Sequence, residues 1–222
     1  ITRSLGAAYD GPGDGTGPLA SVVDYAVGQG ITWFNSAGND AIDLYMKRTV
    51  PTSLGANGYV DFDDTAGTDT WLRLDGYCVL LDGIRWANDW YLATGQKTDY
   101  LIEFWEPTVD VTSLGDDHFN PSLAQVKHLD LDPSTGAVEW TWDANQRTGA
   151  NPLEAEDLYF CPDNFYGPFQ GISYLRIKRN SATTVGTTAD TMEIALGQGL
   201  LELDYYDVNG SAAKPVVDSK SV

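Results

Sequence analysis

Ten short strand-like runs fill the chain from about residue 57 onward, and turn-forming residues separate them. The runs cover residues 59–62, 69–74, 77–86, 99–105, 124–131, 138–142, 155–160, 171–178, 192–196 and 200–206. In several of them, such as residues 174–178, apolar and polar side chains alternate as they do in a strand with one buried face. Because the runs lack helical periodicity, they predict a mainly β chain, folded as an antiparallel β-sandwich or jelly roll.

The first 50 residues have a different pattern, which predicts a strand–helix–strand unit. Residues 1–6 are short and apolar like the end of a strand, and a glycine-rich loop follows. Pro18 suits the first position of a helix, which Gly28 or Gly30 then ends. The apolar side chains of this helix recur at helical spacing on one face: Leu19, Val22, Val23, Ala26 and Val27. With an apolar strand at residues 31–35, the segment predicts a βαβ unit, from which parallel sheets are built.

The charge balance restricts the partners that the chain can have. Its 222 residues include 13 Lys and Arg against 32 Asp and Glu, so the formal net charge is −19 at pH 7. Such an acidic chain repels nucleic acids and anionic membrane surfaces, and no stretch approaches the roughly 20 apolar residues of a membrane-spanning helix. Hydrophobic residues make up 42% and aromatic residues 12%, which indicates a folded chain rather than an acidic disordered tail. We expect no nucleic acid and no membrane as a partner.

Two further features concern the ends of the chain and its cysteines. The chain opens on Ile1 and Thr2, without Met and without a secretory signal region, so we expect a piece of a longer chain. Cys78 and Cys161 both fall in strand-like segments. One disulfide and two buried free thiols are equally good interpretations of this pair. The absence of a CxxC motif or a Cys/His cluster argues against a zinc site.

Two short motifs flank the predicted helix. Ser4-Leu5-Gly6 ends the first strand, and Ser36-Ala37-Gly38-Asn39-Asp40 follows the second. Between them stand Gly15-Thr16-Gly17-Pro18-Leu19, Asp24-Tyr25-Ala26-Val27 and Gly30-Ile31-Thr32. In this order the segment resembles the subtilases, the subtilisin-like serine proteases, in which a strand ending in Ser-Leu-Gly leads through a helix to a strand ending in Ala-Gly-Asn.

The resemblance implies a role for each motif. Asn39 would donate its side-chain N–H to the oxyanion of the tetrahedral intermediate. The walls of the pocket for the substrate side chain would be formed by Ser4, Leu5 and Gly6 on one side and Ser36, Ala37 and Gly38 on the other. An oxyanion needs a preorganised donor about 2.7–3.1 Å away, and in subtilisin the loss of its Asn donor costs about 10²–10³ in rate.

The remainder of the catalytic apparatus is not in this chain. In subtilases the catalytic Asp and His belong to segments ahead of the Ser-Leu-Gly strand, and the nucleophile belongs to a Gly-Thr-Ser-x-Ala-x-Pro motif that does not occur here. Neither His118 nor His128 has the His-Gly-Thr context of the family. We therefore expect no peptide hydrolysis by this chain alone, because the nucleophile, its base and the group that orients the base are missing.

The β region resembles an insertion that some large subtilases carry between the oxyanion Asn and the nucleophile, a jelly roll of the prepeptidase C-terminal-like type. The similar residues are Asp61-Phe62, Ile84-Arg85-Trp86-Ala87-Asn88-Asp89-Trp90, Thr98-Asp99-Tyr100, Asn151-Pro152-Leu153-Glu154 and Tyr174-Leu175-Arg176-Ile177. The resemblance implies three parts. Residues 1–50 are a fragment of the catalytic domain, residues 55–207 are the inserted β-sandwich, and residues 208–222 lead back to the catalytic domain.

Two other groups of residues are candidate binding sites. Asp61, Asp63, Asp64 and Asp69 surround a turn, and carboxylates of this kind bind calcium, although a solvated acidic loop has the same composition. Several tryptophans, with Trp140 and Trp142 on one strand face, are candidates for stacking on sugars. Core packing is the other interpretation of these tryptophans.

These observations lead to one expected function and one alternative. We expect a non-catalytic fragment of a secreted subtilisin-like serine endopeptidase, with the remainder of the protease domain and a peptide or protein substrate as its partners in the intact enzyme. Calcium is the candidate cofactor. The alternative is a stand-alone β-sandwich module that binds carbohydrate or protein.

Overall fold

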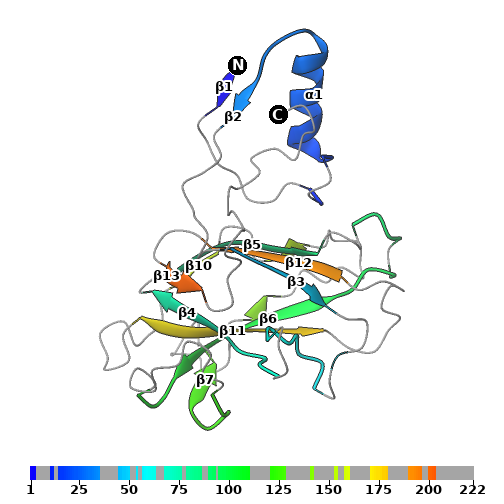
Figure 1. Cartoon of the computed structure of the whole chain (residues 1–222). Helices are drawn as coiled ribbons and strands as arrows, with labels where there is room; N and C mark the ends of the chain where they lie inside the picture. The colour runs from blue at the N-terminus through cyan, green and yellow to red at the C-terminus, as the bar shows by residue number, and fades with distance from the viewer. Residues whose placement is uncertain are drawn as a thin grey trace, which may run out of the picture.

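The chain is mainly β, with one helix among the residues described (Figure 1). The computed structural model describes residues 1–3, 11–12, 15–35, 45–50, 54, 57–63, 68–76, 79–86, 90–93, 95–110, 121–128, 141–142, 153–154, 158–160, 171–179, 190–196 and 200–203. The prediction of a mainly β chain is confirmed.

The described residues between positions 1 and 35 form a small α/β unit, here called the N-terminal unit. Strands β1 (Thr2–Arg3) and β2 (Phe34–Asn35) pair in parallel, and helix α1 (Pro18–Gly28) connects them. Proline is tolerated at the start of α1 because the first amides of a helix have no intrahelical acceptor. Both the helix bounds and the βαβ arrangement agree with the sequence prediction. Within the part of the chain that the structure describes, no helix has the length and hydropathy needed to cross a membrane.

Among the described residues, five antiparallel strands form the first sheet, in the order β10-β5-β12-β3 with β9 also paired to β5. The strands are β3 (Tyr45–Val50), β5 (Val79–Trp86), β9 (Leu153–Glu154), β10 (Leu158–Phe160) and β12 (Asp190–Leu196). Strand β12 lies between β5 and β3, so that segments more than a hundred positions apart in sequence become neighbours.

In the part of the chain that is described, six antiparallel strands form the second sheet, in the order β13-β4-β11-β6-β7 with β8 also paired to β6. The strands are β4 (Leu72–Gly76), β6 (Tyr100–Pro107), β7 (Val126–His128), β8 (Thr141–Trp142), β11 (Ile172–Arg179) and β13 (Leu200–Leu203). Strand β11 is central, with β4 on one side and β6 on the other. We refer to the two sheets together as the β domain.

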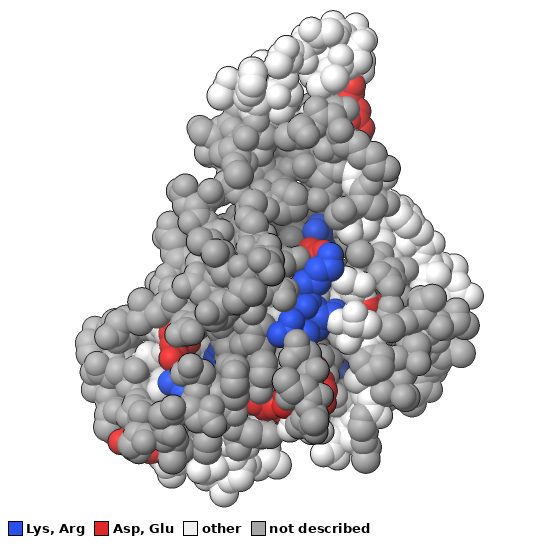
Figure 2. All heavy atoms as spheres, viewed as in Figure 1, with Lys and Arg blue, Asp and Glu red and all other residues white. Residues whose placement is uncertain are grey.

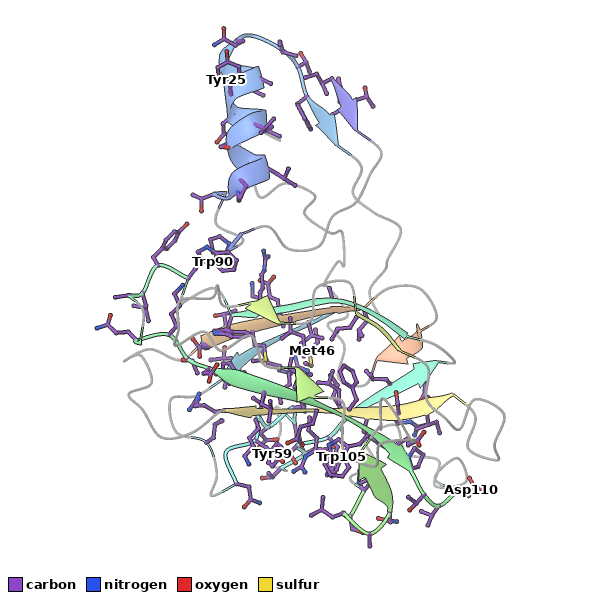
Figure 3. The ribbon with its side chains drawn as sticks, turned by 180° about the vertical axis from the view of Figure 1, so that it is seen from behind. Tyr25, Met46, Tyr59, Trp90, Trp105 and Asp110 are labelled. Atoms are coloured by element: carbon purple, nitrogen blue, oxygen red, sulfur yellow. The ribbon has the colours of Figure 1, made fainter. Side chains whose placement is uncertain are left out.

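The two sheets face one another across a single apolar core. The first sheet contributes Met46, Val50, Leu81, Ile84, Trp86, Met192, Ile194 and Leu196, and the second contributes Leu72, Leu74, Tyr100, Ile102, Phe104, Leu175 and Ile177. Met46 lies between the sheets in Figure 3. Because side chains alternate across a strand, each sheet turns one face to this core and the other face outward.

A connecting segment at residues 57–63 closes one side of the core. Val60 donates its backbone N–H to the Ile177 carbonyl (2.8 Å), and Arg179 donates to the Gly58 carbonyl (2.8 Å). These bonds place the side chains of Val60 and Phe62 in the core, where both are fully buried. The segment therefore acts as a short extension of the second sheet along β11.

The first sheet begins earlier in the chain than the sequence indicated. Strand β3 pairs with β12 over six positions, from Tyr45 opposite Ala195 to Val50 opposite Asp190. No strand was predicted at residues 45–50, and the β-sandwich was expected to start near residue 55. The inward-facing positions of β3 include Arg48 between Met46 and Val50, and this charge hides the strand pattern.

Candidate functional site

The motifs predicted to form the oxyanion site directly follow the two parallel strands. Ser4, Leu5 and Gly6 come after β1, and Ser36, Ala37, Gly38 and Asn39 come after β2. All seven lie outside the described residues. The described pairs are Thr2 with Phe34 and Arg3 with Asn35, so the pairing reaches the residue immediately before each motif.

Hydrogen bonds fix the two strands of the N-terminal unit at their start. The N-terminal ammonium of Ile1 donates to the Thr32 carbonyl (2.7 Å), and the Phe34 N–H donates to the Ile1 carbonyl (2.8 Å). Behind them, α1 packs Ala20 and Val23 into a small cluster with Trp33 at its edge. The arrangement directs two chain segments out of one end of a parallel pair, which is where α/β proteins place their ligand sites.

The glycine-rich loop between β1 and α1 contacts the β domain. Gly11 and Pro12 are buried, and a Cβ at Gly11 would lie 2.3 Å from the Thr16 carbonyl oxygen. The Gly11 carbonyl accepts a hydrogen bond from Arg85 Nη1 on β5 (2.9 Å). A second contact joins the hydroxyl groups of Thr16 and Tyr91.

Arg85 belongs to a row of charges that crosses the outer face of the first sheet. Glu193 on β12 stands directly opposite both Arg85 on β5 and Lys47 on β3. Arg85 donates from Nε (2.9 Å) and Nη2 (2.7 Å) to one Glu193 oxygen, and Lys47 Nζ lies 3.1 Å from the other. Opposite charges placed directly across strands stabilise a sheet. Figure 2 shows basic side chains gathered on one face of the molecule, with acidic side chains beside them.

The acidic turn predicted to bind calcium uses its carboxylates to hold the backbone. Asp61 Oδ1 accepts the N–H groups of Asp63 (3.2 Å) and Asp69 (2.9 Å), and Asp69 Oδ1 accepts that of Trp71 (2.9 Å). Among the residues described, no three acidic, histidine or cysteine side chains come together as a metal site. Asp64 lies outside the described residues, so calcium binding here stays a prediction.

A cluster of aromatic and charged side chains lies on the outer face of the second sheet. The Tyr59 hydroxyl donates to the Glu103 carboxylate (3.1 Å), as does Trp105 Nε1 (3.1 Å). The Arg176 guanidinium stacks 3.5 Å from the Tyr59 ring centre and 4.1 Å from that of Trp71. Figure 3 shows Tyr59 and Trp105 side by side below the sheet.

Burial and charge set the protonation behaviour of this cluster. Burial raises the pKa of Tyr59, and the negative charge of Glu103 raises it further. Burial lowers the pKa of Arg176, against the opposing effects of Tyr59 and Glu103. Cation–π contacts and hydrogen bonds compensate the buried charges, so the described geometry gives this cluster a structural role: it attaches residues 57–63 and 68–71 to the sheet.

A second buried network joins the two sheets at one edge of the core. The Tyr100 hydroxyl donates to Asp190 Oδ2 (2.8 Å), and Arg179 Nη2 donates to the Tyr100 oxygen (3.2 Å). Trp86 packs edge-on against the Tyr100 ring, with 4.9 Å between ring centres. Burial and the neighbouring Asp190 charge raise the pKa of Tyr100 far above its ordinary value.

The tryptophans considered as sugar-stacking platforms divide into three groups. Trp86 is fully buried in the core, which confirms core packing for this residue. Trp90 and Trp105 are partly buried. Trp140 and the side chain of Trp142 lie outside the described residues, as do Cys78, Cys161 and His118.

Sequence reasoning did not assign a role to Arg85, Glu193, Glu103 or Tyr100. A usable signal was present, because Arg85 and Glu193 each stand between two apolar residues of a strand: Ile84-Arg85-Trp86 and Met192-Glu193-Ile194. Two opposite charges at such positions predict a pair if the strands are neighbours. Only the sheet order shows that they are.

Comparisons of the chain with protein-family models, with curated proteins and with solved structures find no match.

Proposed function

We propose that this chain is the non-catalytic part of a secreted subtilisin-like serine endopeptidase. In this proposal the N-terminal unit supplies the substrate-pocket walls and the oxyanion donor Asn39, and the β domain is a jelly-roll insertion. The remainder of the protease supplies the catalytic Asp, His and Ser. Peptides or proteins are its substrates.

The observation that carries the proposal is the parallel pairing of β1 and β2 around α1. The resemblance requires the strand before Ser4 and the strand before Ser36 to lie side by side and point the same way. Two pocket walls can then face one another across a substrate side chain, with Asn39 at the end of the second wall. An antiparallel pair, or strands in separate sheets, would have sent the motifs in different directions.

The β domain supports the proposal at a coarser level. Its two antiparallel sheets share one core, as a jelly-roll insertion requires. The Thr98-Asp99-Tyr100 motif opens β6, as the resemblance implies. Tyr100 contacts Asp190 in the other sheet, which gives a physical reason for a tyrosine at this position.

Asn39→Ala in the intact protein tests the proposed role. The reading frame on both sides of the chain is determined first, and we expect Asp, His and Gly-Thr-Ser-x-Ala segments there. In the intact enzyme, Asn39→Ala should lower kcat by about 10²–10³ with little change in KM, because the donor acts on the transition state. Asn57→Ala, at an exposed turn of the β domain, is the matched control. Absent catalytic segments, or a kcat unaffected by Asn39→Ala, would refute the proposal.

The stand-alone binding module remains the second candidate, with less support from the described residues. Trp86 and Trp71 are buried, so neither offers a free ring to a sugar. Trp90 and Trp105 are partly buried, and Trp140 with Trp142 is the pair predicted to share one strand face. A glycan array with the wild-type chain and the Trp140→Ala and Trp142→Ala variants decides this alternative, which fails if no glycan binds or if binding is unchanged.

A further inference from the structure

Among the residues that the structure describes, Arg85 donates to two targets. Its Nε and Nη2 groups bind Glu193 in the same sheet, whereas Nη1 binds the backbone carbonyl of Gly11 in the N-terminal unit. The side chain is buried, and so is its partner Glu193. Arginine suits this arrangement because its planar guanidinium holds several N–H groups in fixed directions.

The outer face of the first sheet leaves room for another backbone segment beside the Arg85–Glu193 pair. Gly83 and Ala195 stand opposite one another and face outward, next to the Arg85–Glu193 pair. Both are buried although they are on the outer face. Small side chains allow a backbone to lie near the sheet, and Gly11 with Pro12 provides a buried backbone segment bonded to Arg85.

The loop itself leaves no room for a side chain at Gly11. The Thr16 carbonyl oxygen would lie 2.3 Å from a Cβ there, and this neighbour is backbone that cannot rotate away. The contact between Thr16 and Tyr91 then attaches the same loop to a second part of the β domain. Trp90, next to Tyr91, lies between α1 and the first sheet in Figure 3.

We propose that Arg85 is a positioning residue, which fixes the glycine-rich loop on the outer face of the first sheet and so stabilises the N-terminal unit. A helix of 11 residues and a two-stranded sheet are each marginal on their own in water. The unit therefore depends on this anchor. If the proposed function holds, on which this last step rests, the anchor also sets the position of the pocket wall Ser4-Leu5-Gly6, just ahead of Gly11.

Hydrogen–deuterium exchange of the full chain tests the anchor without any measurement of activity. Arg85→Lys keeps a positive charge for Glu193 but removes the fork that also reaches Gly11. We expect exchange in residues 18–28 to become about tenfold faster or more. The loss of a hydrogen bond from a charged donor should shift the equilibrium toward the open, exchanging state by at least about tenfold. Exchange in β6 and β11 should stay as in the wild type. Arg73→Lys, which alters a similar pair with Asp75 on the second sheet, is the matched control and should leave residues 18–28 unchanged.

Gly11→Ala tests the anchor from the other side, without altering the β domain. It should accelerate exchange in residues 18–28 as Arg85→Lys does. Unchanged exchange there in either variant, or equal acceleration in β6 and β11, would overturn the proposal. In the intact enzyme the same variants should raise KM more than they lower kcat. If exchange becomes faster as expected while KM is unaffected, Arg85 stabilises the N-terminal unit but does not set the position of the proposed pocket wall.

Discussion

The N-terminal unit and the β domain differ in how well they bury their large apolar side chains. The β domain encloses its large side chains between two sheets, and Phe104, Trp86 and Ile194 are fully buried there. The N-terminal unit leaves large side chains exposed. Of those exposed in the part of the chain that is described, Ile1, Val22, Tyr25, Ile31 and Phe34 belong to the N-terminal unit, and Tyr91, Val109 and Leu123 belong to the β domain.

The difference indicates which region folds by itself. Strands that pair in parallel are normally covered on both faces, and a two-stranded sheet with one helix cannot provide that cover. The exposed apolar residues of the N-terminal unit show that it leaves part of its apolar surface uncovered. The β domain has a continuous core and needs no further layer. The chain therefore combines a self-sufficient domain with a unit that relies on its contacts.

The largest effect that would test this contrast comes from the core between the sheets. Phe104→Ala should lower the free energy of unfolding by about 3–5 kcal/mol, because it removes a buried ring and leaves a cavity. Val22→Ala, on the exposed surface of α1, should change it by no more than about 0.5 kcal/mol. Urea denaturation followed by tryptophan fluorescence measures both. Similar costs for the two variants would contradict the contrast.

A smaller effect should follow from the network between the sheets. Tyr100→Phe removes the hydroxyl that donates to Asp190 Oδ2 and should cost about 1–3 kcal/mol of the unfolding free energy. Tyr25→Phe, at the most exposed large hydrophobic residue of the N-terminal unit, is the control and should be close to neutral. A neutral Tyr100→Phe would show that the hydroxyl contributes nothing to holding the sheets together.

The raised pKa of Tyr100 predicts a loss of stability in alkaline solution. Its pKa in the folded protein lies well above the unfolded value of about 10, because burial and Asp190 oppose its ionisation. The resulting stabilisation is complete below about pH 10 and is lost as the pH rises toward the folded-state pKa. The unfolding free energy should therefore fall above pH 10 by up to about 1.4 kcal/mol per pH unit. In Tyr100→Phe this slope should be shallower, and an identical slope in both proteins would refute the assignment.

Local patterns in the sequence predicted the elements whose signals are local. The bounds of α1 agree because Pro18 and the apolar spacing act within a few residues of one another. Strand β3 was missed because Arg48 breaks its alternation, whereas Lys47 faces outward as a polar residue should. The inward-facing Arg48 donates to the Phe62 carbonyl at the edge of the core, an acceptor that no local pattern reveals.

The contacts between distant segments could not be predicted in the same way. Arg85 pairs with Glu193 across 108 positions, and Tyr100 with Asp190 across 90. Such pairs depend on the order of strands in the sheets, which alternation does not encode. The anchor on Gly11 is harder still to predict, because its acceptor is a backbone carbonyl that every residue type has.

Separate measurements on residues 1–44 and 45–222 test the central contrast most directly. Circular dichroism should show β structure and one cooperative thermal transition for residues 45–222. Residues 1–44 alone should show no stable helix, since α1 is short and the loop ahead of it has lost the contacts of Gly11 with Arg85 and of Thr16 with Tyr91. A stable helix in residues 1–44, or loss of cooperative unfolding in residues 45–222, would contradict the account.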